Sequence, residues 1–347
     1  MIEHSLLRQQ QEFIEQEIKQ VTENQKNGLY PLEFPMPIGV QFELTMKCNL
    51  YCKHCYNASG EDACTDRMDI SSWLSVIDNI NENGGVFQCI ISGGEPLLYG
   101  KNMFTVMDAL HEKGTGFILI TNGMLIRPST VKKLQKYNYY WVQVSIDDFD
   151  AAKHDDFRGV TGSWDKAIEA AFLLSSAGLP LRIAHSVTPE NLSRLPDMVD
   201  LAYQLGASSI VCGAIMPSGR ASNDETIVCT SEGFLTELYN IIQNKQCEYN
   251  GRMEVLSSSN LKEDIIRKKN QPNSAIVVRP NGDVRMDCTM PFVLGNVFDD
   301  KFSAIWKKHG NSCWSHPKVN EYISKLDMYG EHPEHKNHTD LDIQLDD

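Results

Sequence analysis

The chain has 347 residues and a formal net charge of −14, which disfavours binding to nucleic-acid phosphates and to anionic membrane surfaces. Hydrophobic residues make up 41% and charged residues 22%, an ordinary balance for a soluble globular protein. The sequence contains neither a secretory signal pattern nor the roughly 18 consecutive apolar residues that a membrane span requires. We therefore expect a cytoplasmic protein, with no nucleic-acid or membrane partner, whose ten cysteines are mostly reduced.

The first 37 residues predict an N-terminal helix and a linker. Apolar residues recur at helical spacing over residues 1–25, among glutamine and glutamate. Such a helix either packs on the main domain or docks a partner or peptide. The proline-containing stretch 30–37 then breaks the helix.

Residues 38–222 alternate between short apolar runs and longer helical patterns. Strands are expected at 38–45, 86–92, 117–121, 140–146, 181–187 and 209–215. Several of the intervening helices end in glycine, which favours C-terminal caps at Gly84, Gly114, Gly178 and Gly206. Strands that alternate with helices predict an α/β fold with a parallel sheet. Six units form a partial (β/α)6 TIM-like barrel, because a full barrel needs about 250 residues.

Residues 223–347 predict a smaller α+β C-terminal domain. A helix is expected at 230–245, a β-hairpin at 274–288 with its turn at Asn281-Gly282, and a short helix at 302–310. The acidic tail contains His332, His335 and His338, which could bind metal but are expected to be solvated.

Three cysteines, Cys48, Cys52 and Cys55, follow the first predicted strand, at the end where α/β barrels build their active sites. Cysteine thiolates hold iron–sulfur clusters, and three of them leave one iron of a cubane open. Zinc is the alternative, with His54 or a distant residue as the fourth ligand. The cysteines alone leave both possibilities open.

The second predicted strand ends in Ser-Gly-Gly-Glu-Pro. Gly93 and Gly94 allow a ligand to approach the backbone closely, because no Cβ intervenes. Glu95 then places a carboxylate beside that backbone, and Pro96 fixes the turn.

The order C-x3-C-x2-C and then Gly-Gly-Glu-Pro resembles the radical S-adenosylmethionine (radical SAM) enzymes. The resemblance continues through motifs at 121–123, 144–148, 154–159, 188–191, 217–221 and 295–306. It implies that Cys48, Cys52 and Cys55 hold a 4Fe–4S cluster whose open iron binds S-adenosylmethionine. Reductive cleavage of that cofactor gives a 5′-deoxyadenosyl radical, which abstracts hydrogen from a substrate C–H bond.

The resemblance also implies roles for single residues. Glu95 would accept a hydrogen bond from the cofactor ammonium, and His54 would lie near the adenine. Ser145 would contact the ribose or carboxylate, and Arg158 would pair with the carboxylate unless it forms an ordinary surface salt bridge. Asp148 departs from the family pattern, where glycine is common, so that loop is expected to differ in shape.

The C-terminal region resembles the SPASM or twitch domains that carry auxiliary clusters. Asn273 lies near the position of the first expected cysteine, and no C-x2-C run follows. Only Cys247, Cys288 and Cys313 are plausible ligands there, so we expect a degenerate domain without a second cluster. These cysteines could also be buried packing residues.

These features favour an enzyme that modifies a ribosomal peptide, with a flavodoxin- or ferredoxin-type reductant. Without an auxiliary electron acceptor, epimerisation or another redox-neutral change is slightly favoured, and a thiol at Cys212 or Cys288 could donate the returning hydrogen atom. The alternatives are a small-molecule substrate such as a sugar or amino acid, and oxidative peptide cross-linking with an auxiliary cluster. A non-catalytic scaffold is disfavoured by the intact cysteines.

Overall fold

The computed structural model describes most of the chain. The described residues are 19–20, 22–24, 26–29, 33–60, 66–222, 224–258, 261–270, 275–310, 312–326, 332 and 343–345. Most of the predicted N-terminal helix, together with Asn273, His335 and His338, lies outside the described residues.

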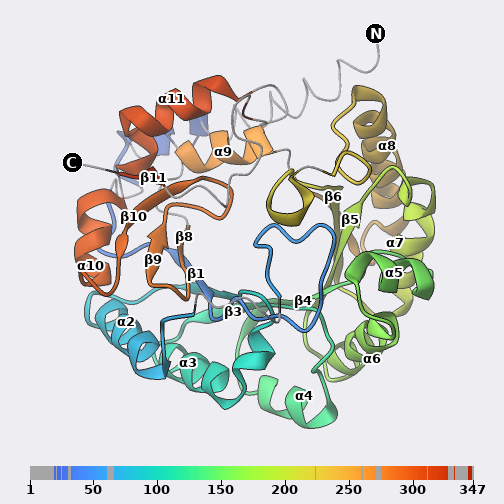
Figure 1. The fold of residues 1–347 in the computed structure, drawn as a ribbon, viewed down its shortest axis with the longest axis horizontal. Coiled ribbons are helices and arrows are strands. Elements are labelled where there is room, and N and C mark those ends of the chain that lie inside the picture. Colours follow the sequence, from blue (N-terminus) through green and yellow to red (C-terminus); the bar gives the residue numbers. More distant parts are fainter. Residues whose placement is uncertain are drawn as a thin grey trace.

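A single sheet of eleven strands forms the centre of the protein, in the order β11-β10-β9-β8-β1-β2-β3-β4-β5-β6-β7 (Figure 1). The six predicted strands are confirmed as β1 (Gly39–Glu43), β2 (Gln88–Ser92), β3 (Gly116–Thr121), β4 (Tyr139–Ser145), β5 (Leu181–Val187) and β6 (Ser209–Ala214). All six are parallel to their neighbours. The α/β fold expected from the sequence is therefore confirmed.

The sheet continues beyond the six predicted strands at both edges. β7 (Glu254–Ser257) adds a seventh parallel strand beside β6, and its four residues are too short to give a clear alternation in sequence. At the other edge, β8 (Ala275–Val278) is parallel to β1. The predicted hairpin is confirmed as β8 and β9 (Asp283–Arg285), which are antiparallel, and it belongs to the central sheet. β10 (Phe292–Asn296) and β11 (Ile343–Gln344) complete the sheet.

Helices surround the sheet on its outer side (Figure 1). Those of the barrel region are α2 (Ile70–Glu82), α3 (Lys101–His111), α4 (Pro128–Leu134), α5 (Ala151–Arg158), α6 (Ser163–Ser176), α7 (Leu195–Gln204) and α8 (Glu232–Tyr249). Those that follow are α9 (Leu261–Asn270), α10 (Phe302–Ile305) and α11 (Pro317–Lys325). All four glycines predicted to cap helices have positive φ angles, as expected for glycine after a last helical turn.

The two faces of the sheet differ in burial. Phe42 of β1 contacts Trp73 of α2, with ring centroids 4.9 Å apart, which identifies the face that packs on the helices. Ile91 of β2 pairs with Phe42 in the strand register, and Leu119 of β3 pairs with Ile91, so all three lie on this face. Their side chains are fully buried. Along β5, buried residues alternate with the half-buried Arg182, Ala184 and Ser186, which lie on the inner face. The inner face therefore lines a space that side chains do not fill completely.

Among the described residues, no helix is long and apolar enough to cross a lipid bilayer. The proposed boundaries between domains, after residues 37 and 222, stay predictions, because the C-terminal strands extend the same sheet as the barrel strands.

A buried asparagine links the barrel to the C-terminal region. The Asn79 side-chain oxygen in α2 accepts a 2.8 Å hydrogen bond from the backbone N–H of Ser303 in α10. Asn79→Ala should lower the free energy of unfolding by about 1 kcal/mol, because this helix N–H loses its partner. Urea denaturation measures the effect, and Glu82→Ala, an exposed substitution in the same helix, is the control. Equal midpoints for the two variants would contradict the assignment.

Candidate active site

The loop that carries the three cysteines leaves the carboxyl end of β1 and is held by backbone contacts to α5. The N–H of Tyr51 donates to the carbonyl of Arg158 at 3.1 Å, and the N–H of Lys53 donates to Phe157 at 3.0 Å. At Gly159, which has a φ of 76°, a Cβ would lie 2.8 Å from the carbonyl oxygen of Tyr51. Glycine is therefore required where the end of α5 meets the cysteine loop.

The loop that follows β6 holds the cysteine loop from the other side. Arg220 donates from Nε to the carbonyl of Cys52 and from Nη1 to the carbonyl of Ser59, both at 2.7 Å. The backbone N–H of Arg220 donates to the carbonyl of Cys55 at 3.0 Å. The cysteine loop is thus fixed by segments that lie about 100 and about 165 residues away in the sequence. Bringing such distant segments together costs conformational entropy.

Two side-chain donors point at the cysteine sulfurs. Asn122 Nδ2 lies 3.8 Å from Cys48 Sγ, and Arg158 Nη1 lies 3.8 Å from Cys52 Sγ. Burial raises the pKa of Cys48 to about 12 and also raises that of Cys52. A buried thiolate at these positions needs a strong positive partner, and a metal centre supplies one. The two side-chain donors stabilise the negative charge on the sulfurs further. The residues present therefore fit an iron–sulfur cluster.

The zinc alternative requires side chains that converge on one ion. Within the described part of the chain, no three or more His, Cys, Asp or Glu side chains are grouped in this way. The cysteines of a cubane each bind a different iron, so they do not need such convergence. His54 stacks on Phe157, with ring centroids 4.6 Å apart, and its Nε2 lies 3.7 Å from Asp147 Oδ2.

The glycines after β2 are required by the protein's own cysteine loop. The N–H of Gly94 donates to Thr45 at 2.7 Å, and the N–H of Glu95 donates to the carbonyl of Lys47 at 2.9 Å. A Cβ at Gly93 or Gly94 would overlap this backbone. The predicted close approach exists, but it is to the loop backbone; contact between these glycines and a cofactor stays a prediction.

Glu95 is a fully buried carboxylate with a fixed orientation. Its Oε1 accepts hydrogen bonds from the N–H of Leu97 at 3.1 Å and the hydroxyl of Thr121 at 2.8 Å, and its Oε2 accepts one from the N–H of Asn122 at 2.8 Å. Burial raises the pKa of Glu95 to about 7, despite these donors. A carboxylate offers about four acceptor positions, so one remains for a further donor.

Arg158 forms a buried ion pair with Asp147, so the expected alternative of a surface salt bridge is wrong. Its Nε and Nη2 lie 2.7 and 2.6 Å from Asp147 Oδ2, and both side chains are buried. Asp147 Oδ1 accepts a 2.9 Å hydrogen bond from the N–H of Ser186 in β5. Burial alone would raise the pKa of Asp147, but the guanidinium beside it holds that pKa well below its usual value.

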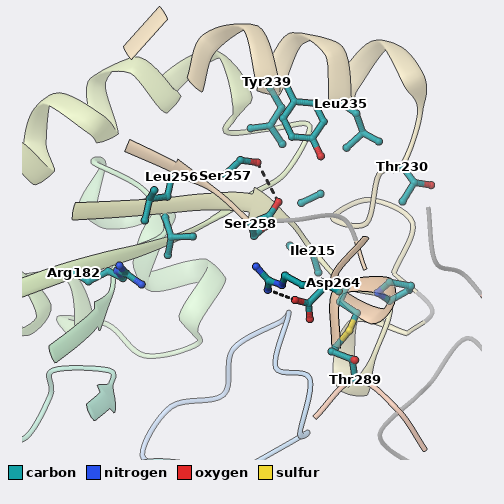
Figure 2. Close-up of a pocket in the computed structure, with 16 residues that line it drawn as sticks. Arg182, Ile215, Thr230, Leu235, Tyr239, Leu256, Ser257, Ser258, Asp264 and Thr289 are labelled. Atoms are coloured by element: carbon teal, nitrogen blue, oxygen red, sulfur yellow. Dashed lines mark hydrogen bonds and ion pairs between the residues drawn. The ribbon is translucent and has the colours of Figure 1, made fainter. Parts of the chain in front are cut away.

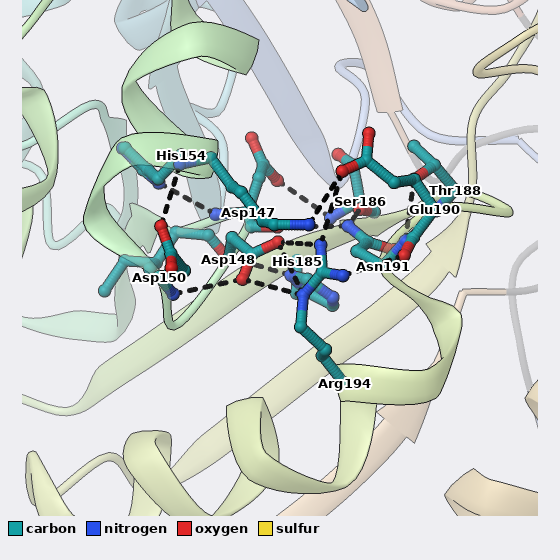
Figure 3. A network of polar contacts seen from close by, with 12 residues as sticks. Asp147, Asp148, Asp150, His154, His185, Ser186, Thr188, Glu190, Asn191 and Arg194 are labelled. Carbon is teal, nitrogen blue, oxygen red and sulfur yellow. Dashed lines mark hydrogen bonds and ion pairs between the residues drawn. The ribbon is translucent and has the colours of Figure 1, made fainter.

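Asp147 lies at the centre of a polar network at the ends of β4 and β5 (Figure 3). Its backbone N–H donates to His154 Nδ1 at 3.1 Å. Next to it, Asp148 pairs with Arg194, whose Nε lies 3.2 Å from both carboxylate oxygens. This ion pair occupies the loop where the family pattern has glycine. The sequence motifs indicate no role for Arg194, and for Asp147 the available signal is an acidic pair, Asp147-Asp148, directly after a strand.

The remaining predicted cofactor contacts lie at the same end of the sheet. Ser145 ends β4 half-buried, opposite Ala184 in the register, and so lies on the inner face. Burial lowers the pKa of His54 to about 4, so its ring is neutral at pH 7. Its Nδ1 is buried and has no hydrogen-bond partner among the described residues.

The structure argues against Cys212 as a hydrogen-atom donor. Cys212 is opposite His185 in the register of β5 and β6 and is fully buried in the hydrophobic core. Alternation along β6 places it on the face that packs on the helices, away from Val211 on the inner face. Tertiary packing thus places Cys212 among the core residues, and this position disfavours the predicted role of its thiol as a hydrogen donor.

The other C-terminal cysteines occupy three different elements. Cys247 is exposed in α8, and Cys313 is buried and donates from Sγ to the carbonyl of Gly310 at 3.3 Å. Cys288 follows β9 and is half-buried; burial raises the pKa of its thiol. Its electrostatic neighbours include Asp287, Lys268 and Glu43. Whether these cysteines support a second cluster stays a prediction.

A cavity of about 520 Å³ opens at the carboxyl ends of β6 and β7 (Figure 2). Met216 and Pro217 form part of its wall, and they directly precede the loop that holds the cysteine loop. Thr289, which follows Cys288, lines the cavity on another side. The cavity therefore lies next to the segment that leads to Arg220, which binds the cysteine loop, and next to the residues that follow the C-terminal hairpin.

Three curated proteins resemble the chain in sequence. The antilisterial bacteriocin subtilosin biosynthesis protein AlbA of Bacillus subtilis is 31% identical over 285 residues, covering 79% of this chain and 60% of that protein. The AdoMet-dependent heme synthase of Methanosarcina barkeri is 31% identical, covering 55% and 54%. The PqqA peptide cyclase of Granulibacter bethesdensis is 30% identical, covering 50% and 46%. The chain thus spans about half of the length of the relatives it matches.

Solved structures share the fold. Streptococcus suis SuiB bound to S-adenosylmethionine superposes with a TM-score of 0.66 at 17% identity, covering 85% of this chain and 69% of that one. The anSMEcpe structure with bound AdoMet gives 0.63 at 18% identity, covering 80% and 82%. The sequence pattern of the Radical SAM superfamily matches residues 42–202. The chain therefore carries a radical SAM domain, the domain of enzymes that use a 4Fe–4S cluster and S-adenosylmethionine.

Proposed function

We propose that this radical SAM enzyme modifies a ribosomally made peptide. The observation that carries the proposal is the cysteine loop, with donors directed at two sulfurs, beside a cavity of about 520 Å³. Ligand cavities of ~300–1,000 Å³ are typical, and this one can accept a peptide segment. AlbA and PqqA peptide cyclase are named for bacteriocin biosynthesis and peptide cyclisation, and a SuiB structure holds the precursor peptide SuiA.

A small-molecule substrate is the second candidate, because heme synthases are also relatives. The two are separated by anaerobic incubation with S-adenosylmethionine, dithionite and synthetic peptides that correspond to any short open reading frames next to the gene. A mass change in such a peptide supports the proposal. Formation of 5′-deoxyadenosine with unchanged peptides would favour the small-molecule candidate.

Cys48, Cys52 and Cys55 would hold the cluster, and the bound cofactor pair supplies the radical that removes a hydrogen atom from the substrate. The remaining acceptor position of Glu95 suits the cofactor ammonium. Arg158 uses Nε and one Nη2 hydrogen for Asp147, so guanidinium N–H groups remain for the cofactor carboxylate. We assign Ser145, on the inner face, to the ribose or carboxylate of the cofactor, and His54, whose Nδ1 has no partner among the described residues, to the adenine.

We propose a redox-neutral outcome with Cys288 as the hydrogen donor. Burial raises the pKa of Cys288, so its sulfur stays protonated, which is the form that can give up a hydrogen atom. Donation forms a C–H bond on the substrate and leaves a sulfur radical. One electron and one proton, from a flavodoxin- or ferredoxin-type reductant and solvent, would restore the thiol.

The cluster assignment predicts a loss of iron. Reconstituted wild-type protein should hold about four irons per chain. Replacing Cys48, Cys52 and Cys55 together with alanine should abolish the brown chromophore and 5′-deoxyadenosine formation, because the thiolate ligands are gone. Cys247→Ala, at an exposed position, is the control. A triple variant that still cleaves S-adenosylmethionine would refute the assignment.

The ion pair predicts an effect on the cluster itself. Arg158→Gln removes the cation beside Cys52, so the reduced cluster, which carries one more negative charge, should be less stable. Its reduction potential should become more negative in a titration followed by EPR. Arg194→Gln breaks the neighbouring pair with Asp148, and Arg194 contacts none of the cysteines that the structure describes, which makes this variant the matched control. Equal potentials in both variants would show that Arg158 does not act on the cluster.

The donor assignment predicts an isotope pattern. In deuterium oxide, a redox-neutral epimerase should add one deuterium to the product and leave the peptide otherwise unchanged. Cys288→Ala should lose this exchange, whereas Cys313→Ala, at another buried thiol, should keep it. A product lighter by two hydrogens would instead establish oxidation.

A further inference from the structure

An arginine on the inner face of the sheet lines the cavity without a carboxylate partner. Arg182, the second residue of β5, donates from Nε to Ser209 Oγ at 2.9 Å. Its Cζ lies 3.7 Å from the ring centroid of Trp141. These two contacts fix the plane of the guanidinium and leave its terminal nitrogens available.

No described carboxylate lies within ion-pair distance of Arg182. Glu254 acts on it electrostatically but is exposed and forms no ion pair with it. Burial lowers the pKa of Arg182, as expected for a cation that has lost water without gaining an anion. The other arginine of the cavity, Arg267, differs because it pairs with Asp264. Among the described residues that line the cavity, Arg182 is therefore a positive charge without an ion-pair partner, in a chain of net charge −14.

The wall beside Arg182 is apolar. Val211 and Leu256 are opposite each other in the register of β6 and β7. Leu235 and Tyr239 of α8 also line the cavity, above Leu256 in the view of Figure 2. Arg182 lies on one side of these residues in the same view. An aliphatic or aromatic side chain would gain free energy by leaving water here, and a neighbouring carboxylate could pair with the guanidinium.

We propose that this cavity binds a peptide segment in which an acidic residue, held by Arg182, adjoins an apolar residue on the wall formed by Val211 and Leu256. The proposal rests on the peptide-modifying function above and names the sequence character of its substrate. A guanidinium binds a carboxylate through two parallel hydrogen bonds, which selects aspartate or glutamate over neutral polar residues.

A random heptapeptide library, selected for binding to the reconstituted full chain with S-adenosylmethionine, tests the proposal without knowledge of the natural peptide. Wild-type protein should enrich aspartate or glutamate at one position by about tenfold, with an apolar residue near it. Arg182→Gln should lose the acidic preference and keep the apolar one. The matched control is Arg252→Gln, since Arg252 also stacks on an aromatic ring, 4.9 Å from the centroid of Tyr249, but is exposed and outside this cavity.

Wild-type selection without an acidic preference, or an unchanged preference in Arg182→Gln, would overturn the proposal. Arg182→Lys retains the charge and should keep a weaker acidic preference. If Arg182→Gln loses all binding, the Arg182→Lys variant decides. An acidic preference in that variant supports the proposal, and the absence of an acidic preference overturns it. Because the selection reads binding alone, 5′-deoxyadenosine formation and peptide modification report separately on the proposed function.

Discussion

The buried ion pair between Asp147 and Arg158 is the interaction on which the site depends. It joins the end of β4 to the last residue of α5, and through the N–H of Ser186 it also reaches the end of β5. The same guanidinium faces Cys52, and the carbonyl of Arg158 receives the N–H of Tyr51. Breaking a buried pair from one side costs about 3–5 kcal/mol, because a charge is then left unpaired. The position of the cysteine loop therefore depends on this ion pair.

Three further features extend this constraint across the sheet. Glu95 fixes the end of β2 to the end of β3, and the Gly93-Gly94 backbone packs directly on the cysteine loop. Arg220 closes the far side by binding two carbonyls of that loop. Parallel strands bring all of these carboxyl ends to one edge. The result is a loop whose backbone is held from several strands, which suits a cluster whose ligands must keep a fixed spacing.

Burial then sets the chemistry of the titratable groups. The raised pKa of Cys48 and the low pKa of His54 have the same cause, since removal from water disfavours the charged form of each. The pKa of Asp147 is lowered despite burial, chiefly because the guanidinium of Arg158 lies beside it. A site that excludes water also protects a radical intermediate from side reactions. Arg182 and Val211 line a cavity on the inner face of the same sheet.

Local patterns in the sequence predict the parallel strands, the hairpin turn at Asn281-Gly282 and the cysteine loop, because alternation, turn residues and motif spacing involve neighbouring residues. The other features of the site depend on packing between distant segments. Cys212 falls on the helix-packed face because side chains alternate along a strand, and its register could not be read from the chain. The partner of Arg158 and the unpaired state of Arg182 depend on residues brought together by the barrel. Such contacts join distant segments, so only the folded sheet fixes them.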